Sequence, residues 1–262
     1  LYAHIEKAFD SPSKYKDPNT NPRCLFPYRY KWLAKKISAL QGLPKIKCEE
    51  YKKYIRRHAA KSVSLVFSAY NVSSPSSAFG HTLLRVSKEK LSAKSNKRKY
   101  ELLDYGINYA ASIPEGTNPM LYAFGGMGGI FPGNFSSVPY YYKIREYNDY
   151  EARDIWSYEL NLSQEEVDDL MDHLWEAGRS TYDYYFLTEN CAYYIMRAVD
   201  AAVPRLKLTS KIPYWVIPGD TIRALKEEPG LIASVSYRAS VATQFHKRIE
   251  NFTEEEKSLV KL

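Results

Sequence analysis

The chain has 262 residues, of which 45% are hydrophobic and 26% are charged. These proportions are typical of a folded globular protein and exclude an intrinsically disordered one. No apolar run approaches the roughly 20 residues that a membrane-spanning helix needs, so we expect no transmembrane segment. The net charge of +7 favours an anionic partner, such as an envelope polymer or lipid head groups. No nucleic-acid-binding motif accompanies this charge, so nucleic acid is not an expected partner.

The first 60 residues differ in character from the rest. Residues 11–36 open with proline, asparagine and serine and then become amphipathic. This pattern predicts an ordered, extended arm that leads into short helices ending near residues 48–59. We therefore expect an N-terminal arm with helices over residues 1–60, packed on a domain over residues 61–262, in one compact unit.

Strands are expected where β-branched and aromatic residues concentrate. The basic segment 88–100 lacks apolar periodicity, which predicts a solvated loop joining two strands as an antiparallel hairpin. The glycine-dense segment 124–136 has neither P-loop nor dinucleotide-binding spacing, so we interpret it as a flexible loop beside a substrate. The aromatic cluster at residues 182–187 suits either core packing or the wall of a groove. The predicted strands are residues 62–70, 81–86, 100–111, 140–147 and 153–162.

Residues 163–178 form the clearest predicted helix. Ser163 and Glu166 make a capping box at its start, and Gly178 marks its end. His173 lies off the apolar stripe of this helix, so we expect it on the surface. The stripe consists of Val167, Leu170, Met171 and Leu174.

Three cysteines divide into one pair and one remaining thiol. Cys24 and Cys48 lie in the same N-terminal segment, whereas Cys191 is remote. A disulfide between Cys24 and Cys48 with a free Cys191 is the preferred arrangement, and it implies an oxidising compartment. Three reduced and unrelated thiols are the alternative, which the cysteine count alone does not exclude.

Cys191 falls in the first turn of a predicted helix that Thr188 or Asn190 can cap. A buried structural cysteine fits this position. The free amides and the positive dipole end of a first turn also favour a thiolate, so a reactive thiol fits equally well. The predicted buried face of the helix consists of Cys191, Tyr194, Ile195, Ala198 and Val199.

His81 is the strongest candidate for a base that activates Cys191. It opens a predicted strand directly after a turn of small residues, so its imidazole is expected at the end of a sheet. In the proposed hairpin, Asn108 is the closer match in register for orienting the His81 ring, and Asp104 is the second candidate. On spacing alone, a His81 that merely satisfies a buried hydrogen bond is equally consistent.

Other chemistries have weaker support. The histidines and cysteines show neither CxxC nor HExxH spacing, so no metal site is expected, and no cofactor is implied. The GxSxG pattern of a serine nucleophile is absent. A pair of carboxylates such as Glu101 with Asp104 stays open as a glycosidase-like alternative, although a chain of this size supplies such pairs by chance.

Six segments in fixed order carry a family resemblance that runs from about Cys24 to about Val203. They resemble the bacterial Lnb N-terminal periplasmic domain family, which is itself similar to circularly permuted papain-like proteins of the NlpC type. In that arrangement the histidine strand precedes the cysteine helix. The segments are PRCLFPYRYKWL, SSPSSAFGHTLLRV, YGINYAA, GGMGGIFPGNFS, REYNDYEARDIWSYELNLS and YYFLTENCAYYIM.

The resemblance implies an α+β fold in which a helix bearing the cysteine packs on an antiparallel sheet. It implies Cys191, in ENC, as the nucleophile and His81, in FGHT, as the base. It leaves the third position open between Asn108 and Asp104, with Asn108 preferred. It also implies a periplasmic or cell-envelope location, in agreement with the proposed disulfide. The residues expected to flank the substrate are Ser77, Phe79, Tyr105 and Asn190.

By this resemblance the leading hypothesis is a thiol hydrolase of the bacterial envelope that cleaves an amide bond, with a peptidoglycan peptide as substrate. Lipid or lipoprotein acyl transfer is the alternative chemistry, which exposed apolar surface beside Cys191 would favour. A non-catalytic module that binds an envelope polymer is the alternative from another class. Residues 212–225 either close over the site or cover the sheet.

Overall fold

One sheet of seven strands occupies the centre of the computed structural model, which describes residues 2–70, 79–90 and 101–260. The strand order is β6-β4-β3-β2-β1-β5-β7, and every neighbouring pair is antiparallel. The predicted α+β class therefore holds at this level. The strands are β1 (Ser62–Ser68), β2 (His81–Ser87), β3 (Tyr105–Ala111), β4 (Pro132–Pro139), β5 (Ile155–Leu160), β6 (Thr181–Asp183) and β7 (Ile232–Arg238).

Helices surround this sheet and extend beyond both of its ends. Among the described residues, no helix is long and apolar enough to cross a membrane. The helices are α1 (Tyr2–Ala8), α2 (Pro22–Leu25), α3 (Pro27–Lys36), α4 (Glu49–His58), α6 (Pro119–Met127), α7 (Tyr140–Ile144), α8 (Gln164–Ala177), α9 (Cys191–Ala202), α10 (Pro218–Lys226), α11 (Val241–Ile249) and α12 (Glu254–Val260).

The central strands β1 and β2 are buried on both faces, as their β-branched sequences require. They pair along their whole length, from Ser62 opposite Ser87 to Ser68 opposite His81. This register places His81 at the end of the sheet, where the sequence predicts it.

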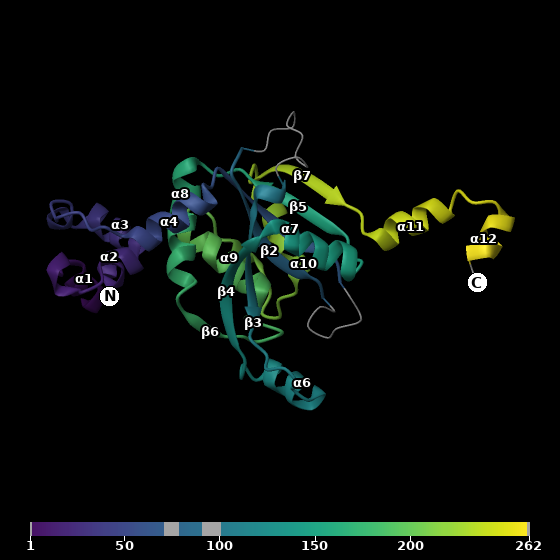
Figure 1. Cartoon of the computed structure of the whole chain (residues 1–262), viewed down its shortest axis with the longest axis horizontal. Helices are drawn as coiled ribbons and strands as arrows, with labels where there is room; N and C mark the ends of the chain where they lie inside the picture. The colour runs from purple at the N-terminus through teal and green to yellow at the C-terminus, as the bar shows by residue number, and fades with distance from the viewer. Residues whose placement is uncertain (1, 71–78, 91–100, 261–262) are drawn as a thin grey trace.

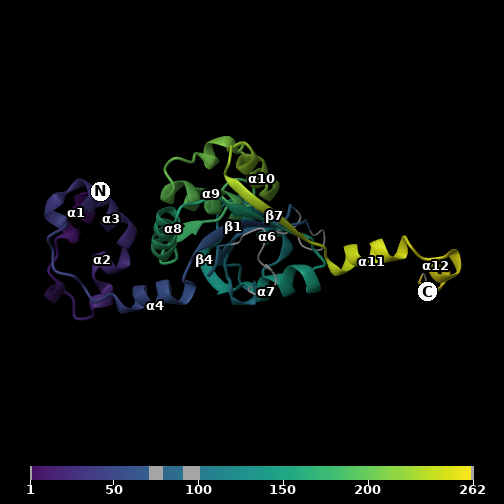
Figure 2. The same ribbon diagram turned by 90° about the horizontal axis from the view of Figure 1, so that it is seen from above.

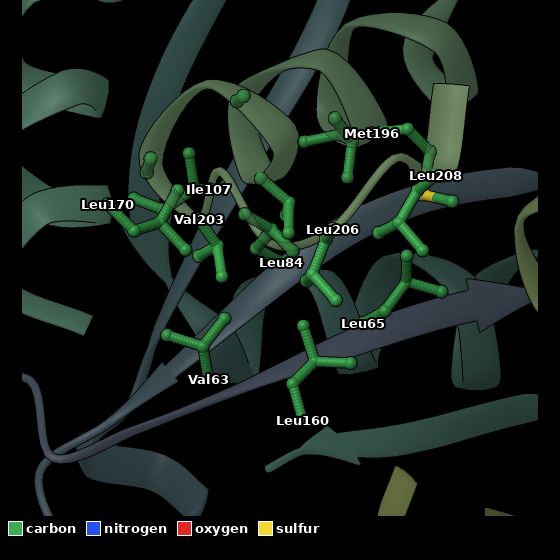
Figure 3. Packing of buried hydrophobic residues seen from close by; sticks show 14 of the residues in the cluster. Val63, Leu65, Leu84, Ile107, Leu160, Leu170, Met196, Val203, Leu206 and Leu208 are labelled. Carbon is green, nitrogen blue, oxygen red and sulfur yellow. The ribbon is translucent and has the colours of Figure 1, made fainter. Parts of the chain in front are cut away.

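Helices α8, α9 and α10 cover one face of the sheet, and the short helix α7 lies against the other (Figure 2). The main core lies under the first group, where Leu65 and Leu84 from the strands meet Met196 from α9 (Figure 3). Helix α8 begins and ends as predicted, with the Ser163 and Glu166 capping box at one end and Gly178 at the other. The spacing of its apolar stripe therefore fixes which side of α8 faces the sheet.

The N-terminal helices form a separate group beside the sheet, at the end opposite α11 and α12 (Figure 1). A disulfide joins Cys24 to Cys48 within this group, and Cys191 is free, as the cysteine arrangement predicts. The indole Nε1 of Trp175 in α8 donates to the backbone oxygen of Cys24 at 2.9 Å. This contact connects the cross-linked N-terminal segment to the layer that covers the sheet.

The prediction of a strand over residues 140–147 is wrong. Residues 140–144 form α7, and a π-helix, η6 (Arg145–Tyr150), continues it. Tyr140, Ile144 and Tyr147 recur at helical spacing and together pack on the second face of the sheet. Their aromatic content suggested a strand, but their spacing of four and three residues matches a helix.

The glycine-dense segment is also not a flexible loop. It contains the end of α6, and then β4, which pairs with β3 and β6. A side chain at Gly133 would collide with the hydroxyl of Tyr109, and one at Gly126 would collide with the ring of Phe186. These glycines therefore permit close packing of aromatic rings against the backbone.

The third predicted strand begins five residues later than expected. Residues 101–103 form a short 3-10 helix, η5 (Glu101–Leu103), and β3 starts at Tyr105. Strands β2 and β3 are antiparallel as predicted, with Leu84 opposite Ile107. Most of the basic segment predicted as the connecting loop, residues 91–100, lies outside the described residues.

Candidate active site

Cys191 is the first residue of α9, and its side chain is buried with 3% exposure. The preceding Asn190 caps the helix, because its side-chain oxygen accepts from the backbone N–H groups of Ala192 and Tyr193. The amide of Asn190 donates to the backbone oxygens of Phe186 and Val216. Asn190 thereby fixes the start of α9 against the two chain segments on either side of it.

His81, the first residue of β2, forms a side-chain hydrogen bond with Cys191. Its Nε2 lies 2.5 Å from the side-chain oxygen of Asn108 on β3. Since an amide oxygen only accepts, Nε2 carries a proton in this contact, which leaves Nδ1 as the nitrogen available to the thiol. Three residues from a helix, a strand and its neighbouring strand thus form one thiol–imidazole–amide chain.

The surroundings of Cys191 favour its ionised form. Burial by itself raises the pKa of the thiol, but the positive charge of His81 and hydrogen bonds from His81, the Thr82 backbone and Tyr184 together lower the pKa below its ordinary value. A hydrogen bond from a backbone N–H and one from a phenol stabilise a thiolate in the same way as an oxyanion. The site therefore favours a nucleophilic sulfur.

The imidazole of His81 shows the complementary behaviour. Burial lowers its pKa, but the charge of the Cys191 thiolate and hydrogen bonds to Cys191 and Asn108 outweigh burial and raise the pKa. The two shifts together favour a thiolate–imidazolium pair over a neutral thiol and imidazole.

Tyr184 is a member of the site that no sequence motif indicated. Its hydroxyl accepts from the backbone N–H of Cys191 at 3.2 Å and also hydrogen-bonds the Cys191 side chain. Burial and the Cys191 charge raise the pKa of Tyr184 well above its ordinary value, so the phenol keeps its proton. The only sequence signal was the aromatic cluster at residues 182–187, interpreted as core or groove wall.

The start of α9 leaves few donors for an oxyanion. The amides of Ala192 and Tyr193 already donate to the Asn190 side chain. The N–H of Cys191 points at the hydroxyl of Tyr184 instead. An oxyanion formed beside the sulfur would therefore draw its donors from the Cys191 N–H, released from Tyr184, and from the Tyr184 O–H and the Thr82 backbone N–H that hydrogen-bond the sulfur.

A cavity of about 280 Å³ opens beside the sulfur of Cys191. This volume is near the lower end of the roughly 300 to 1,000 Å³ of ligand pockets. None of its described lining residues carries a charged side chain. Its walls are Phe79 and Gly80, the α6 residues Pro119, Tyr122, Ala123 and Met127, the aromatics Tyr184 and Phe186, and Leu187, Asn190, Cys191, Val216 and Pro218.

The structure places two of the expected substrate-flanking residues, Phe79 and Asn190, in this cavity wall. Tyr105 lies elsewhere, at the start of β3, where its ring packs on His58 with centroids 4.6 Å apart. Ser77 lies outside the described residues. In residues 212–225, Val216 lines the cavity and Leu225 joins the main core.

Asp104, the second candidate for orienting His81, has other partners. Its carboxylate accepts from Arg85 at 2.6 Å and from the hydroxyl of Ser87 at 2.7 Å, in a buried ion pair. Asp104 comes just before β3, which pairs with β4 from Tyr105 onward, whereas Asn108 lies within the strand. Asp104 therefore holds the far end of β2 and makes no contact with the imidazole.

His173 also departs from its expected position. It is half-buried, with its ring 5.5 Å from that of Tyr28 in α3, because the N-terminal helices pack on this side of α8. Within the described residues, no group of three or more histidine, cysteine or acidic side chains could hold a metal ion.

Fold and site together define a mixed α and β protein with a Cys–His–Asn constellation at the end of an antiparallel sheet. The sequence profile of the Lnb N-terminal periplasmic domain matches residues 50–228, and the chain belongs to this family. The family places the protein in the periplasm, where the Cys24–Cys48 disulfide can form and persist. No curated protein and no solved structure is significantly similar to the chain.

Proposed function

We propose that the protein is a thiol-dependent acyl-transfer enzyme of the cell envelope, with Cys191 as its nucleophile. The observation that carries the proposal is the hydrogen-bonded chain from Cys191 through His81 to Asn108. A structural cysteine needs neither an ionisable partner nor a group that orients that partner. Such an arrangement is what general-base activation of a thiol requires.

In the first half-reaction the Cys191 thiolate attacks the carbonyl carbon of an ester or amide, and a carbon–sulfur bond forms. The carbonyl oxygen becomes an oxyanion beside the Cys191 N–H and the Tyr184 hydroxyl. When the oxyanion collapses, the bond to the leaving oxygen or nitrogen breaks, and the leaving group takes the proton of His81. In the second half-reaction an acceptor gives its proton to His81, attacks the thioester and releases the Cys191 thiolate.

The order of the elements supports a circularly permuted papain-like fold for this chemistry. The strand that begins with His81 comes before the helix that begins with Cys191, and the orienting Asn108 lies on the strand next to that of His81. The papain-like resemblance rests on this order and on the sequence motifs. By this resemblance Cys191, His81 and Asn108 would be the nucleophile, the base and the orienting residue.

The cavity favours an acyl chain over a peptide. The sequence resemblance alone points to a peptidoglycan peptide, which carries ionised groups. The described cavity wall has no charged side chain to pair with them, and burying an unpaired charge is costly. An acyl chain would instead gain from burial against Phe79, Met127 and Phe186. The substrate class that we propose is therefore the acyl ester of a lipid or lipoprotein.

A thioester on Cys191 tests both the nucleophile and the substrate class. Wild type and Cys191→Ala are incubated with detergent-solubilised diacyl phospholipid in one arm and with peptidoglycan fragments in the other. Intact-protein mass spectrometry should show an acyl adduct on wild type alone, in the lipid arm alone, and neutral hydroxylamine should remove it.

Ser136→Ala serves as the matched control, because Ser136 is an exposed nucleophile on β4 outside this cavity. An adduct that persists in Cys191→Ala would overturn the role of Cys191. Released peptide fragments in the peptidoglycan arm, lost in Cys191→Ala, would restore the amide hydrolase. If Cys191 reacts with iodoacetamide no faster than in unfolded protein, the chain is instead a binding module.

A further inference from the structure

Helix α6 exposes apolar side chains in most directions. Six of its nine residues are exposed, and all six are apolar: Pro119, Met120, Leu121, Ala123, Phe124 and Met127. The side chains of Met120 and Phe124 are 71% and 64% exposed. A helix that is apolar all round is normally buried in a protein core or in lipid. Figure 1 shows that α6 projects beyond the ends of β3 and β4, away from the body of the molecule.

A second apolar segment lies at the same cavity. Tyr214, Trp215 and Ile217 are exposed, at 81%, 66% and 43%, and the intervening Val216 lines the cavity beside Cys191. Helix α6 supplies four residues to the wall of the same cavity. The two segments therefore flank one opening, and we name Met120, Leu121, Phe124, Trp215 and Ile217 the mouth patch.

Charge is absent from the chain around the mouth patch. Residues 116–142 contain no aspartate, glutamate, lysine or arginine, and neither do residues 212–218. Tryptophan and tyrosine at the edge of an apolar patch suit the boundary between lipid head groups and acyl chains. The whole chain has a net charge of +7, which an anionic lipid surface complements.

We infer that the mouth patch docks the protein on the surface of a phospholipid bilayer, with α6 and residues 214–217 among the head groups. The inference rests on the proposed function in one respect, because the occupant must leave the cavity mouth open to an acyl substrate. A protein that covered the patch would seal the mouth, whereas a bilayer covers the patch and also supplies acyl chains. The docked orientation places the Cys191 sulfur above the lipid from which its substrate would come.

Vesicle sedimentation of the whole chain tests the docking. The vesicles contain phosphatidylethanolamine and phosphatidylglycerol at about three to one, and a second set contains phosphatidylcholine alone. The variant M120Q/F124Q changes two mouth-patch residues that do not line the cavity. Its vesicle-bound fraction at fixed lipid should fall roughly tenfold, because two apolar side chains leave the interface.

The matched control is V241Q/F245Q on α11, which has the same four-residue spacing and two exposed apolar side chains. Figure 1 shows α11 on an extension of the chain remote from α6. This control should bind vesicles as wild type does. Equal binding by M120Q/F124Q and wild type overturns the docking, as does equal loss in both double variants.

Two further measurements separate the possible failures. Cys191→Ala should bind vesicles as wild type does, because its change lies outside the mouth patch. If wild type binds vesicles but acquires no acyl adduct on Cys191, only the proposed function is rejected. Light scattering without lipid should give the same mass for wild type and M120Q/F124Q. A wild-type dimer that M120Q/F124Q converts to a monomer would identify the occupant as a second copy of the chain and overturn the bilayer. Thermal unfolding monitored by circular dichroism establishes that each variant is folded.

Discussion

The hydroxyl of Tyr184 contacts Cys191 twice: it accepts from the backbone N–H at 3.2 Å and hydrogen-bonds the side-chain sulfur. One phenol thus contacts both the nucleophile and the backbone donor beside it. In the resting site its proton stabilises the thiolate. In the mechanism that we propose, the same proton would donate to the oxyanion that forms next to the sulfur.

We expect Tyr184→Phe to slow acylation of Cys191 by about 10- to 1,000-fold, as the loss of one oxyanion donor does in other acyl-transfer sites. The pKa of Cys191 should also rise, because one hydrogen bond to the thiolate is lost. Stopped-flow acylation by a thioester-forming substrate, with alkylation measured across pH, reports both changes. An unchanged acylation rate and an unchanged Cys191 pKa would show that the Tyr184 hydroxyl has no role beyond packing.

Asn108 and Asp104 can be separated directly. Asn108→Ala leaves the His81 ring without its partner, so we expect acylation to slow by about 10- to 100-fold with little loss of stability. Asp104→Asn disrupts a buried ion pair with Arg85 and should lower the free energy of unfolding by about 3 kcal/mol while the thiol stays reactive. Urea unfolding and alkylation of both variants test this contrast, and the reverse pattern would assign Asp104 to the site.

The opposite pKa shifts of Cys191 and His81 predict a pH window for thiol reactivity. The Cys191 pKa is lowered, so iodoacetamide should still react at pH values below those at which an ordinary thiol, with a pKa near 8.5, is protonated. The His81 pKa is raised, so the imidazolium partner is lost only on the alkaline side. In His81→Ala the alkylation midpoint should move up in pH; a midpoint equal to that of wild type would contradict the ion pair.

The Cys24–Cys48 disulfide closes a loop with a sequence separation of 24 residues. A loop of this length restricts the unfolded chain, and replacing both cysteines by alanine should lower the free energy of unfolding by about 2 to 4 kcal/mol. Calorimetry of C24A/C48A measures the loss. Wild type with the disulfide reduced is the control for the cross-link alone, and an unchanged free energy of unfolding on reduction would show that the disulfide adds nothing.

Two titratable groups on α8 have opposite effects on stability. Burial raises the pKa of Glu176 to about 7, despite hydrogen bonds from Arg29 and Tyr28, and burial with Arg29 nearby lowers the pKa of His173 to about 4. Because the folded protein favours the protonated form of Glu176, this residue contributes stability below about pH 4.5, and the contribution is lost as the pH rises towards 7. Stability from a lowered histidine pKa is present above about pH 6.5 and is lost towards pH 4.

The two effects oppose each other between about pH 4.5 and 6.5, so wild type should show little slope there. Glu176→Gln removes one of them. Its free energy of unfolding should then rise with pH across this window by about 1 to 2 kcal/mol, since His173, the group that remains, is only half-buried. Urea unfolding at several pH values gives the slope, and parallel curves for wild type and Glu176→Gln would show that the carboxyl does not titrate as described.

The sequence by itself determined the local parts of the site. A capping residue at Thr188 or Asn190 and the helical spacing after Cys191 placed the thiol in a first turn, because capping and periodicity depend on neighbouring residues. The structure assigns the cap to Asn190. The strand beginning at His81 followed from β-branched content and the preceding turn. The number and positions of the cysteines predicted the disulfide, which the structure confirms. The ordered motifs predicted the family, which the family match confirms.

Only the tertiary structure decided which distant groups meet. Loop length left the register of β2 and β3 uncertain by several residues, and the observed pairing brings Asn108 rather than Asp104 to His81. Tyr184, which hydrogen-bonds Cys191, and Val216, which lines the cavity beside it, lie in segments of irregular backbone, for which no periodic pattern exists. The exposure of α6 also could not be predicted from the sequence, since an apolar helix has the same sequence whether it is buried in a core or exposed.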